Sequence, residues 1–146
     1  MPKLTSDLKL TGYVTVKING KVVQEIPNLV VTSGKQHAVA RLKDATATAM
    51  SHMAAGTGSS ATSAGDTTLG TESARVALTS STVSGETVTY VATFPANTPS
   101  TLTALNEAGI FNASSGGTML CRTVFAGVIN KDTSDAMSIT WAISAS

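Results

Sequence analysis

Residues 101–126, TLTALNEAGIFNASSGGTMLCRTVFA, hold two apolar, β-rich runs on either side of Ser114-Ser115-Gly116-Gly117. Small polar residues and glycines between such runs are typical of a hairpin turn, because glycine adopts positive φ without steric cost. One acid, Glu107, and one base, Arg122, lie inside the runs. If the runs pair, these charges can face each other across the ladder. We expect a structural ion pair, with a functional polar site buried in the sheet as the alternative.

The N-terminal part of the chain predicts a second hairpin. Apolar and polar residues alternate from Leu8 to Ile18, which is the period of a strand with one buried face. Asn19-Gly20 follows, and this dipeptide favours a type I′ turn, which needs positive φ at both central residues. The returning strand is expected over Lys21–Ile26. Pro27 is expected to end the pairing, because proline has no N–H to donate.

One helix is predicted, over residues 34–44. Ser33-Gly34-Lys35-Gln36 has the spacing of a capping box, with Ser33 as the N-cap residue. Ala38, Val39 and Leu42 then recur at helical spacing. Because this apolar stripe is small, we expect it to lie against a sheet rather than to form a core alone.

The remainder of the chain predicts further strands. The clearest are Glu86–Pro95, where apolar residues alternate with threonines, and the stretch from Met137 to the C-terminus. Shorter runs, Met50–Ala55 and Ala74–Ser80, are also expected to be strands. About eight antiparallel strands at roughly ten-residue spacing are typical of a β-sandwich or jelly roll. The expected fold class is therefore all-β, with one short helix near residues 34–44.

Length and composition limit the classes of protein to which the chain can belong. A chain of 146 residues favours a single domain, which we assign to residues 8–146, with residues 1–7 as an N-terminal arm. Only 19 residues are charged, while 17 Ser and 23 Thr are present. This composition suits a β-protein whose surface is neutral or partly covered by other subunits. The net charge of +1, without clustered Lys or Arg, argues against direct nucleic-acid binding.

Two further classes are disfavoured. No apolar run approaches the roughly 20 residues of a membrane helix, so no membrane partner is expected. Cys121 is the single cysteine, which excludes a disulfide within one chain, and its apolar neighbours predict a free buried thiol.

No motif for chemistry stands out. Gly56-Thr57-Gly58 lacks the third glycine and the following helix of a dinucleotide-binding loop. His37 and His52 are the only histidines, and a zinc site needs three or four ligands at short spacing. No serine has the context of a nucleophile elbow, and no separated pair of exposed carboxylates suggests glycoside hydrolysis. We therefore predict no catalytic, cofactor-binding or metal-binding residues, no cofactor, and no enzymatic activity.

The segment 45–71 is long, polar and poorly patterned, and it carries no charged residue from Ala45 to Gly65. We expect it, together with the N-terminal arm, to form contact surfaces for other subunits, since such segments need a partner to order them. Glu72 and Arg75, three residues apart, are expected to brace the transition from this segment to the next strand.

Several pieces of the sequence together resemble a group of small tailed-bacteriophage virion proteins. Their order and spacing match over residues 28–144, while the hairpin over residues 8–26 lies outside the match. The pieces are Asn28–Gly34, Met53–Gly58, Asp66–Leu69 with Glu72 and Arg75, Asn106–Asn112, Gly116–Leu120 with Arg122 and Phe125, and Ile139–Ile143.

The resemblance implies a β-sandwich subunit that assembles with copies of itself on a phage particle. Similar sequences are named capsid decoration (cement) proteins, head fibres or tail fibres, and the resemblance transfers no catalytic residue. A short chain without coiled-coil heptads or collagen triplets fits a compact cap better than a fibre shaft. The expected partners are the major capsid protein and copies of the chain itself, as a homodimer or a trimer, with the dimer slightly favoured.

The expected location is the capsid surface of the virion, after synthesis in the host cytoplasm. The alternative, which rests on the same motifs, is a tail or collar fibre or adaptor protein.

Overall fold

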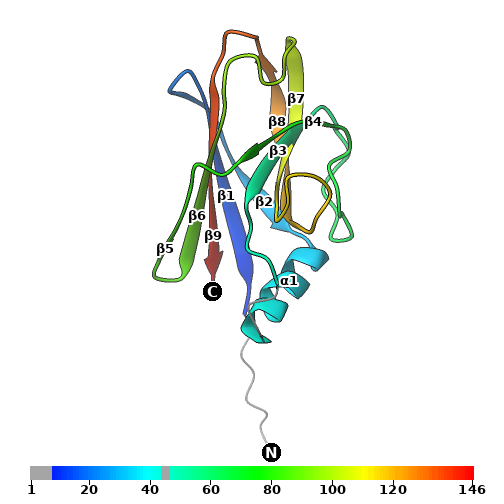
Figure 1. Cartoon of the computed structure of the whole chain (residues 1–146), viewed down its shortest axis with the longest axis vertical. Helices are drawn as coiled ribbons and strands as arrows, with labels where there is room; N and C mark the ends of the chain where they lie inside the picture. Colours follow the sequence, from blue (N-terminus) through cyan, green and yellow to red (C-terminus); the bar gives the residue numbers. More distant parts are fainter. Residues whose placement is uncertain (1–7, 44–46) are drawn as a thin grey trace, which may run out of the picture.

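The computed structural model describes residues 8–43 and 47–146, so the predicted N-terminal arm, residues 1–7, lies outside the described residues. Within them the chain forms nine strands and one helix (Figure 1). The elements are β1 Leu10–Ile18, β2 Lys21–Val30, α1 Thr32–Lys43, β3 His52–Gly56, β4 Glu72–Ala77, β5 Ser80–Ser84, β6 Thr87–Phe94, β7 Thr103–Phe111, β8 Met119–Lys131 and β9 Met137–Ala145.

All nine strands are joined in one antiparallel sheet of order β4-β3-β7-β8-β2-β1-β9-β6-β5. Strand β2 belongs to both halves of this sheet. Most of its length pairs with β1, and only its last two residues, Leu29 and Val30, pair with Arg122 and Cys121 of β8. The sheet therefore curls at β2, which brings its two halves face to face (Figure 1).

The core lies between the two halves. In β9 the inward-facing residues alternate with outward-facing ones, and every second residue from Met137 to Ile143 is buried. The half built around β9 and the half built around β7 contribute to the same apolar cluster. Its members include Trp141, Phe94, Phe125, Met53, Met137, Leu105, Ile110 and Ile139.

The predicted all-β class with a single helix is confirmed. The ninth strand is β5, whose five residues, SSTVS, are all exposed. The finer prediction of a sandwich or jelly roll is not confirmed, because hydrogen bonds join all the described strands in one curled sheet.

The N-terminal hairpin forms as predicted, with φ of 50° at Asn19 and 82° at Gly20. The prediction that Pro27 ends the pairing is wrong. Strand β2 continues to Val30, with Pro27 opposite Tyr13 of β1. Proline lacks a donor but keeps its acceptor, and the Pro27 carbonyl accepts a hydrogen bond of 3.0 Å from the Thr123 hydroxyl of β8.

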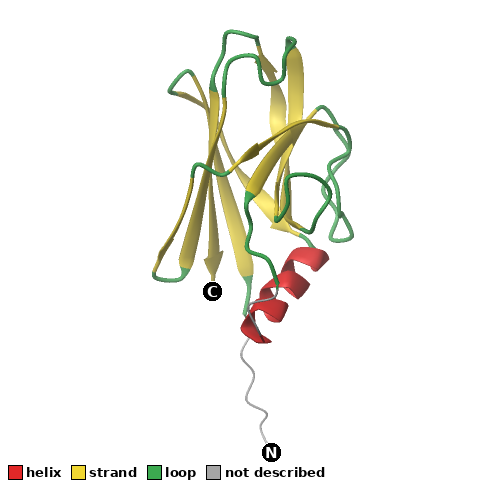
Figure 2. Cartoon of the chain, viewed as in Figure 1, coloured by secondary structure: helices red, strands yellow, loops and turns green. Residues whose placement is uncertain are grey.

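The helix starts two residues earlier than predicted, and its packing face differs from the prediction. Ser33 lies inside α1, and its hydroxyl donates to the Met119 carbonyl of β8 instead of capping the helix. Gly34 is the buried residue of α1, and a Cβ there would collide with the Leu120 carbonyl. Because the helix approaches β8 through this glycine, Val39 and Leu42 face outward. Figure 2 shows α1 at one end of the molecule, where β1 begins and β9 ends.

The hairpin of residues 101–126 is confirmed as β7 and β8. Its turn contains two glycines with positive φ, 59° at Gly116 and 77° at Gly117, as glycine-rich hairpin turns require. The register places Glu107 opposite Val124 and Gly109 opposite Arg122. Glu107 and Arg122 are thus diagonal neighbours on one face of the sheet, close enough for their side chains to meet.

Candidate functional site

Glu107 and Arg122 form the expected ion pair, and both side chains are buried. The Glu107 carboxylate accepts five hydrogen bonds. Arg122 donates two of them to Oε1, from Nε at 3.1 Å and Nη2 at 3.0 Å. Backbone N–H groups donate the other three, from Gly70 to Oε1 at 2.7 Å and from Gly58 and Thr71 to Oε2 at 2.7 and 2.8 Å.

Arg122 extends this network to further residues of the 57–71 loop. Its Nη1 donates to the Asp66 carboxylate at 3.1 Å, and its Nη2 donates to the Ser60 carbonyl at 3.0 Å. A weaker contact of 3.4 Å reaches the Ala61 carbonyl. The guanidinium therefore joins two carboxylates and two loop carbonyls, as its planar set of donors allows.

Three glycines let the loop approach the carboxylate. A Cβ at Gly58 would collide with the Glu107 carboxylate, and one at Gly56 would meet its Oε2 at 2.8 Å. At Gly70 the corresponding distance is 3.5 Å. The glycines at positions 56 and 58 thus have a structural role: Gly58 brings its backbone N–H to the Glu107 carboxylate, and Gly56 lets the Thr71 backbone approach.

The network holds the 57–71 loop in place through both carboxylate oxygens of Glu107. Both oxygens of Glu107 are engaged by donors. The alternative of a functional polar site would need an unpaired group facing a cavity. The geometry thus favours the structural ion pair over the functional site at this position.

Glu72 and Arg75 also pair as predicted, with two guanidinium nitrogens at 2.6 and 3.1 Å from the carboxylate oxygens. The same guanidinium donates to the carbonyls of Ala113 and Gly116, at 2.9 and 2.8 Å. It lies 3.9 Å from the centroid of the Phe111 ring. Arg75 therefore braces β4 against the β7–β8 turn, a contact that the sequence did not indicate.

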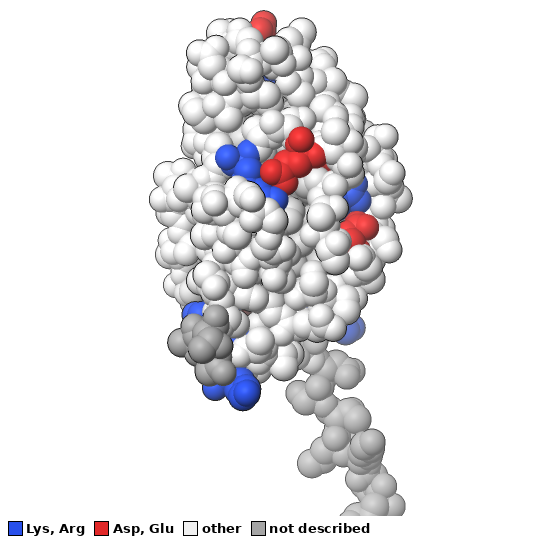
Figure 3. Space-filling view, turned by 45° about the vertical axis from the view of Figure 1, so that its right-hand side comes forward, with Lys and Arg blue, Asp and Glu red and all other residues white. Residues whose placement is uncertain are grey.

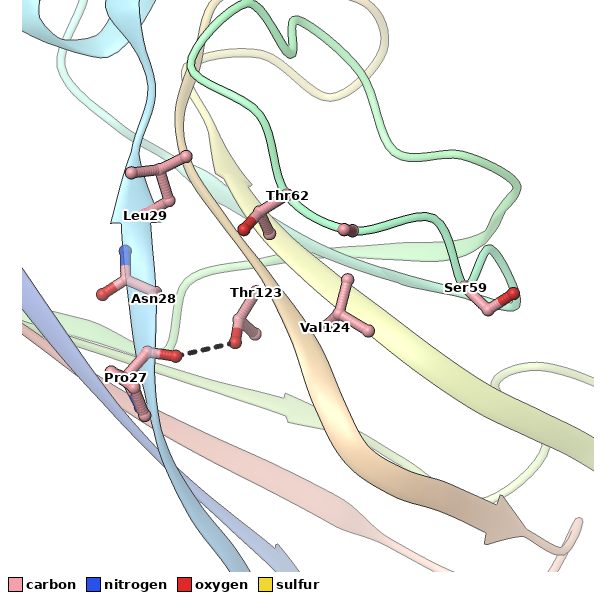
Figure 4. Close-up of a pocket in the computed structure, with 8 residues that line it drawn as sticks. Pro27, Asn28, Leu29, Ser59, Thr62, Thr123 and Val124 are labelled. Atoms are coloured by element: carbon pink, nitrogen blue, oxygen red, sulfur yellow. Dashed lines mark hydrogen bonds between the residues drawn. The ribbon is translucent and has the colours of Figure 1, made fainter.

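A pocket of about 480 Å³ lies between β2, β8 and the loop that Glu107 holds (Figure 4). Its lining residues are Pro27, Asn28, Leu29, Ser59, Ala61, Thr62, Thr123 and Val124. None of these side chains is ionisable, so the pocket offers only packing and neutral hydrogen bonds.

The Asn28 amide has no hydrogen-bond partner at either of its buried atoms. Its side chain points away from Thr62 and Thr123 in Figure 4, and a Cβ at Gly12 would collide with it. The amide therefore lies over Gly12 on the inner face of the sheet rather than in the pocket.

Lys131 is a buried cation that sequence reasoning missed. Its ammonium donates to the Pro95 carbonyl at 2.9 Å. Burial lowers the pKa of Lys131, and the nearby Asp135 carboxylate partly opposes this. The pKa of Asp135 is itself lowered, first by the hydrogen bond from the Asp132 backbone N–H and then by the one from the Asn19 amide. The bond between Asn19 and Asp135 ties the β8–β9 turn to the β1–β2 turn.

The remaining candidates do not converge. His52 shares a hydrogen bond of 2.8 Å with the neighbouring Ser51, while His37 lies on α1. Cys121 is a free, buried thiol, as predicted, and burial raises its pKa. Across residues 8–43 and 47–146, no three His, Cys, Asp or Glu side chains are grouped closely enough to hold a metal ion.

Comparison with models of known protein families, with curated proteins and with solved structures gives no match to this chain. The one helix in the described part of the chain is too short to span a membrane.

Proposed function

We propose that the protein is a bacteriophage capsid decoration (cement) protein, which binds the outer surface of the major capsid protein lattice and stabilises the shell without enzymatic activity. The sequence motifs supply the phage origin. The structural observation that carries the proposal is the 57–71 loop, which a buried ion pair holds in place and whose most exposed residues are uncharged.

The exposed residues of this loop are small and uncharged. They are Ser59, Ser60, Ala61, Ser63, Ala64, Gly65, Thr67, Thr68, Gly70 and Thr71. Contact with such a surface removes no charge from water, and a pre-ordered loop loses little conformational entropy on binding. A protein that must add contacts between preformed subunits benefits from both properties, and we assign this loop surface to contacts with neighbouring subunits.

The stoichiometry of this chain relative to the major capsid protein in purified particles tests the proposal. A cement protein occupies the lattice, so we expect a ratio near one to one. Particles lacking the chain should also release their DNA at a lower temperature. Unchanged heat resistance of those particles would contradict a role in shell stability.

The second candidate is a tail or collar fibre or adaptor protein, which rests on the same motifs. The single compact domain of the described residues, without an elongated repeat, favours the capsid. A ratio of a few per cent to the major capsid protein would support the fibre instead.

A further inference from the structure

The outward face of α1 combines exposed apolar and cationic side chains. Val39 is 65 % exposed and Leu42 is 84 % exposed. Lys35 lies four residues before Val39 and Lys43 four residues after it, so all four side chains share one face of the helix. This docking face, defined as Lys35, Val39, Leu42 and Lys43, is exposed and does not include Gly34, through which α1 packs on β8.

More apolar surface is exposed at the same end of the molecule. Val83 of β5 is 74 % exposed and lines a largely apolar pocket of about 330 Å³ together with Ala38 and Arg41 of α1. Leu8, which precedes β1, is also 74 % exposed. Scattered exposed apolar residues need no explanation, but a gathering of large ones at one end marks an interaction surface.

All the charged side chains of α1 are cationic. The helix carries Lys35, Arg41 and Lys43 and no carboxylate. In Figure 3, Lys and Arg side chains gather at the lower end of the molecule, whereas most of the surface in view is uncharged. Arg41 and Lys43 in the last turn stabilise the helix dipole, but Lys35 in the first turn opposes it. The helix dipole therefore does not favour Lys35, whose exposed charge is available to an acidic partner.

We propose that the docking face binds an acidic protein surface with an apolar centre and that, given the proposed capsid function on which this rests, this surface lies on the outside of the major capsid protein. Self-association through this face would bring lysines against lysines, which disfavours a second copy. Nucleic acid is disfavoured because Val39 and Leu42 are aliphatic and offer no ring for base stacking.

The test is co-sedimentation of the purified protein with particles assembled without it. The variant K35E/K43E reverses both lysines of the docking face, and K17E/K21E makes the same charge change beside the β1–β2 turn. We expect K35E/K43E to bind at least about tenfold more weakly and K17E/K21E to bind as the unmodified protein does. A third variant, Leu42→Ser, should also weaken binding. Circular dichroism and urea unfolding check that the variants remain folded.

Each other outcome overturns the inference in a distinct way. If K35E/K43E and the unmodified protein bind equally well, the proposed docking face is refuted, whereas the proposed capsid function stands. If the unmodified protein does not bind the particles, both the docking face and the capsid function are refuted. Dimerisation that is lost only in K35E/K43E would assign the face to a second copy. Binding of a random DNA duplex, lost in the same variant at about 150 mM salt, would assign it to nucleic acid.

Discussion

Replacing Glu107 with glutamine should destabilise the protein strongly, although the side chain keeps its shape. The amide removes the negative charge that pairs with Arg122. In the unmodified protein, backbone N–H groups donate to both carboxylate oxygens, whereas in the variant an NH₂ group replaces one of these acceptors. Removing one partner of a buried ion pair typically costs about 3–5 kcal/mol. A domain of this size has a free energy of unfolding of about 5–15 kcal/mol, so the loss is a large fraction of the total.

Urea unfolding measures this loss. With a slope of about 2 kcal/mol per M, the midpoint of Glu107→Gln should fall by about 1.5–2.5 M relative to the unmodified protein. Glu25→Gln is the matched control, because Glu25 is exposed on β2, and its midpoint should move by the equivalent of about 0.5 kcal/mol or less.

Limited proteolysis gives an independent measurement if the variant is too unstable for a full unfolding curve. The 57–71 loop should become the first cleavage site for a broad-specificity protease, since the carboxylate that binds its backbone N–H groups is gone. A loss of stability below about 1 kcal/mol, with the loop still protected, would refute the view that the buried pair holds the loop, because an exposed pair contributes that much.

Three further outcomes are expected. Gly58→Ala should lose about 1–3 kcal/mol because its Cβ collides with the carboxylate, while Gly65→Ala, with open space around it, should be neutral or stabilising in the same unfolding assay. Cys121 should react with a thiol reagent only when the protein unfolds. Burial raises the pKa of its thiol, so the unfolded chain loses this proton at a lower pH than the folded protein does. The free energy of unfolding should therefore fall above about pH 9, and should fall less in Cys121→Ala. Arg75→Lys should lose about 1–2 kcal/mol in thermal unfolding, because lysine cannot replace the paired donors and the ring contact together; an unchanged midpoint would argue against this brace.

The sequence predicted the parts of the site that depend on local register. Glu107 and Arg122 lie on one hairpin, so the turn between their strands was enough to bring them together. The donors from Gly58, Gly70 and Thr71 come from a loop far away in the chain, and no local pattern connects them to Glu107. Glycine at such positions signals a close approach but not the group that is approached.

Two predictions about the fold were wrong because backbone contacts, rather than the pattern of apolar side chains, determined the structure. The apolar residues Val39 and Leu42 suggested the buried side of α1, but close packing of the backbone through Gly34 determined it. Strand β5 was missed because Ser80–Ser84 is nearly all hydroxyl-bearing and shows no alternation of apolar and polar residues. Its pairing with β6 depends on backbone hydrogen bonds and the turn at Gly85.

The position of β9 has a consequence for biosynthesis. This strand is the last described element, yet it lies between β1 and β6 and supplies Trp141 to the core. While the ribosome is still making residues 137–145, the edges of β1 and β6 that will pair with β9 remain open to other chains. Half of the sheet can therefore close only after translation of β9, and nascent chains on one messenger RNA must avoid pairing with each other until then.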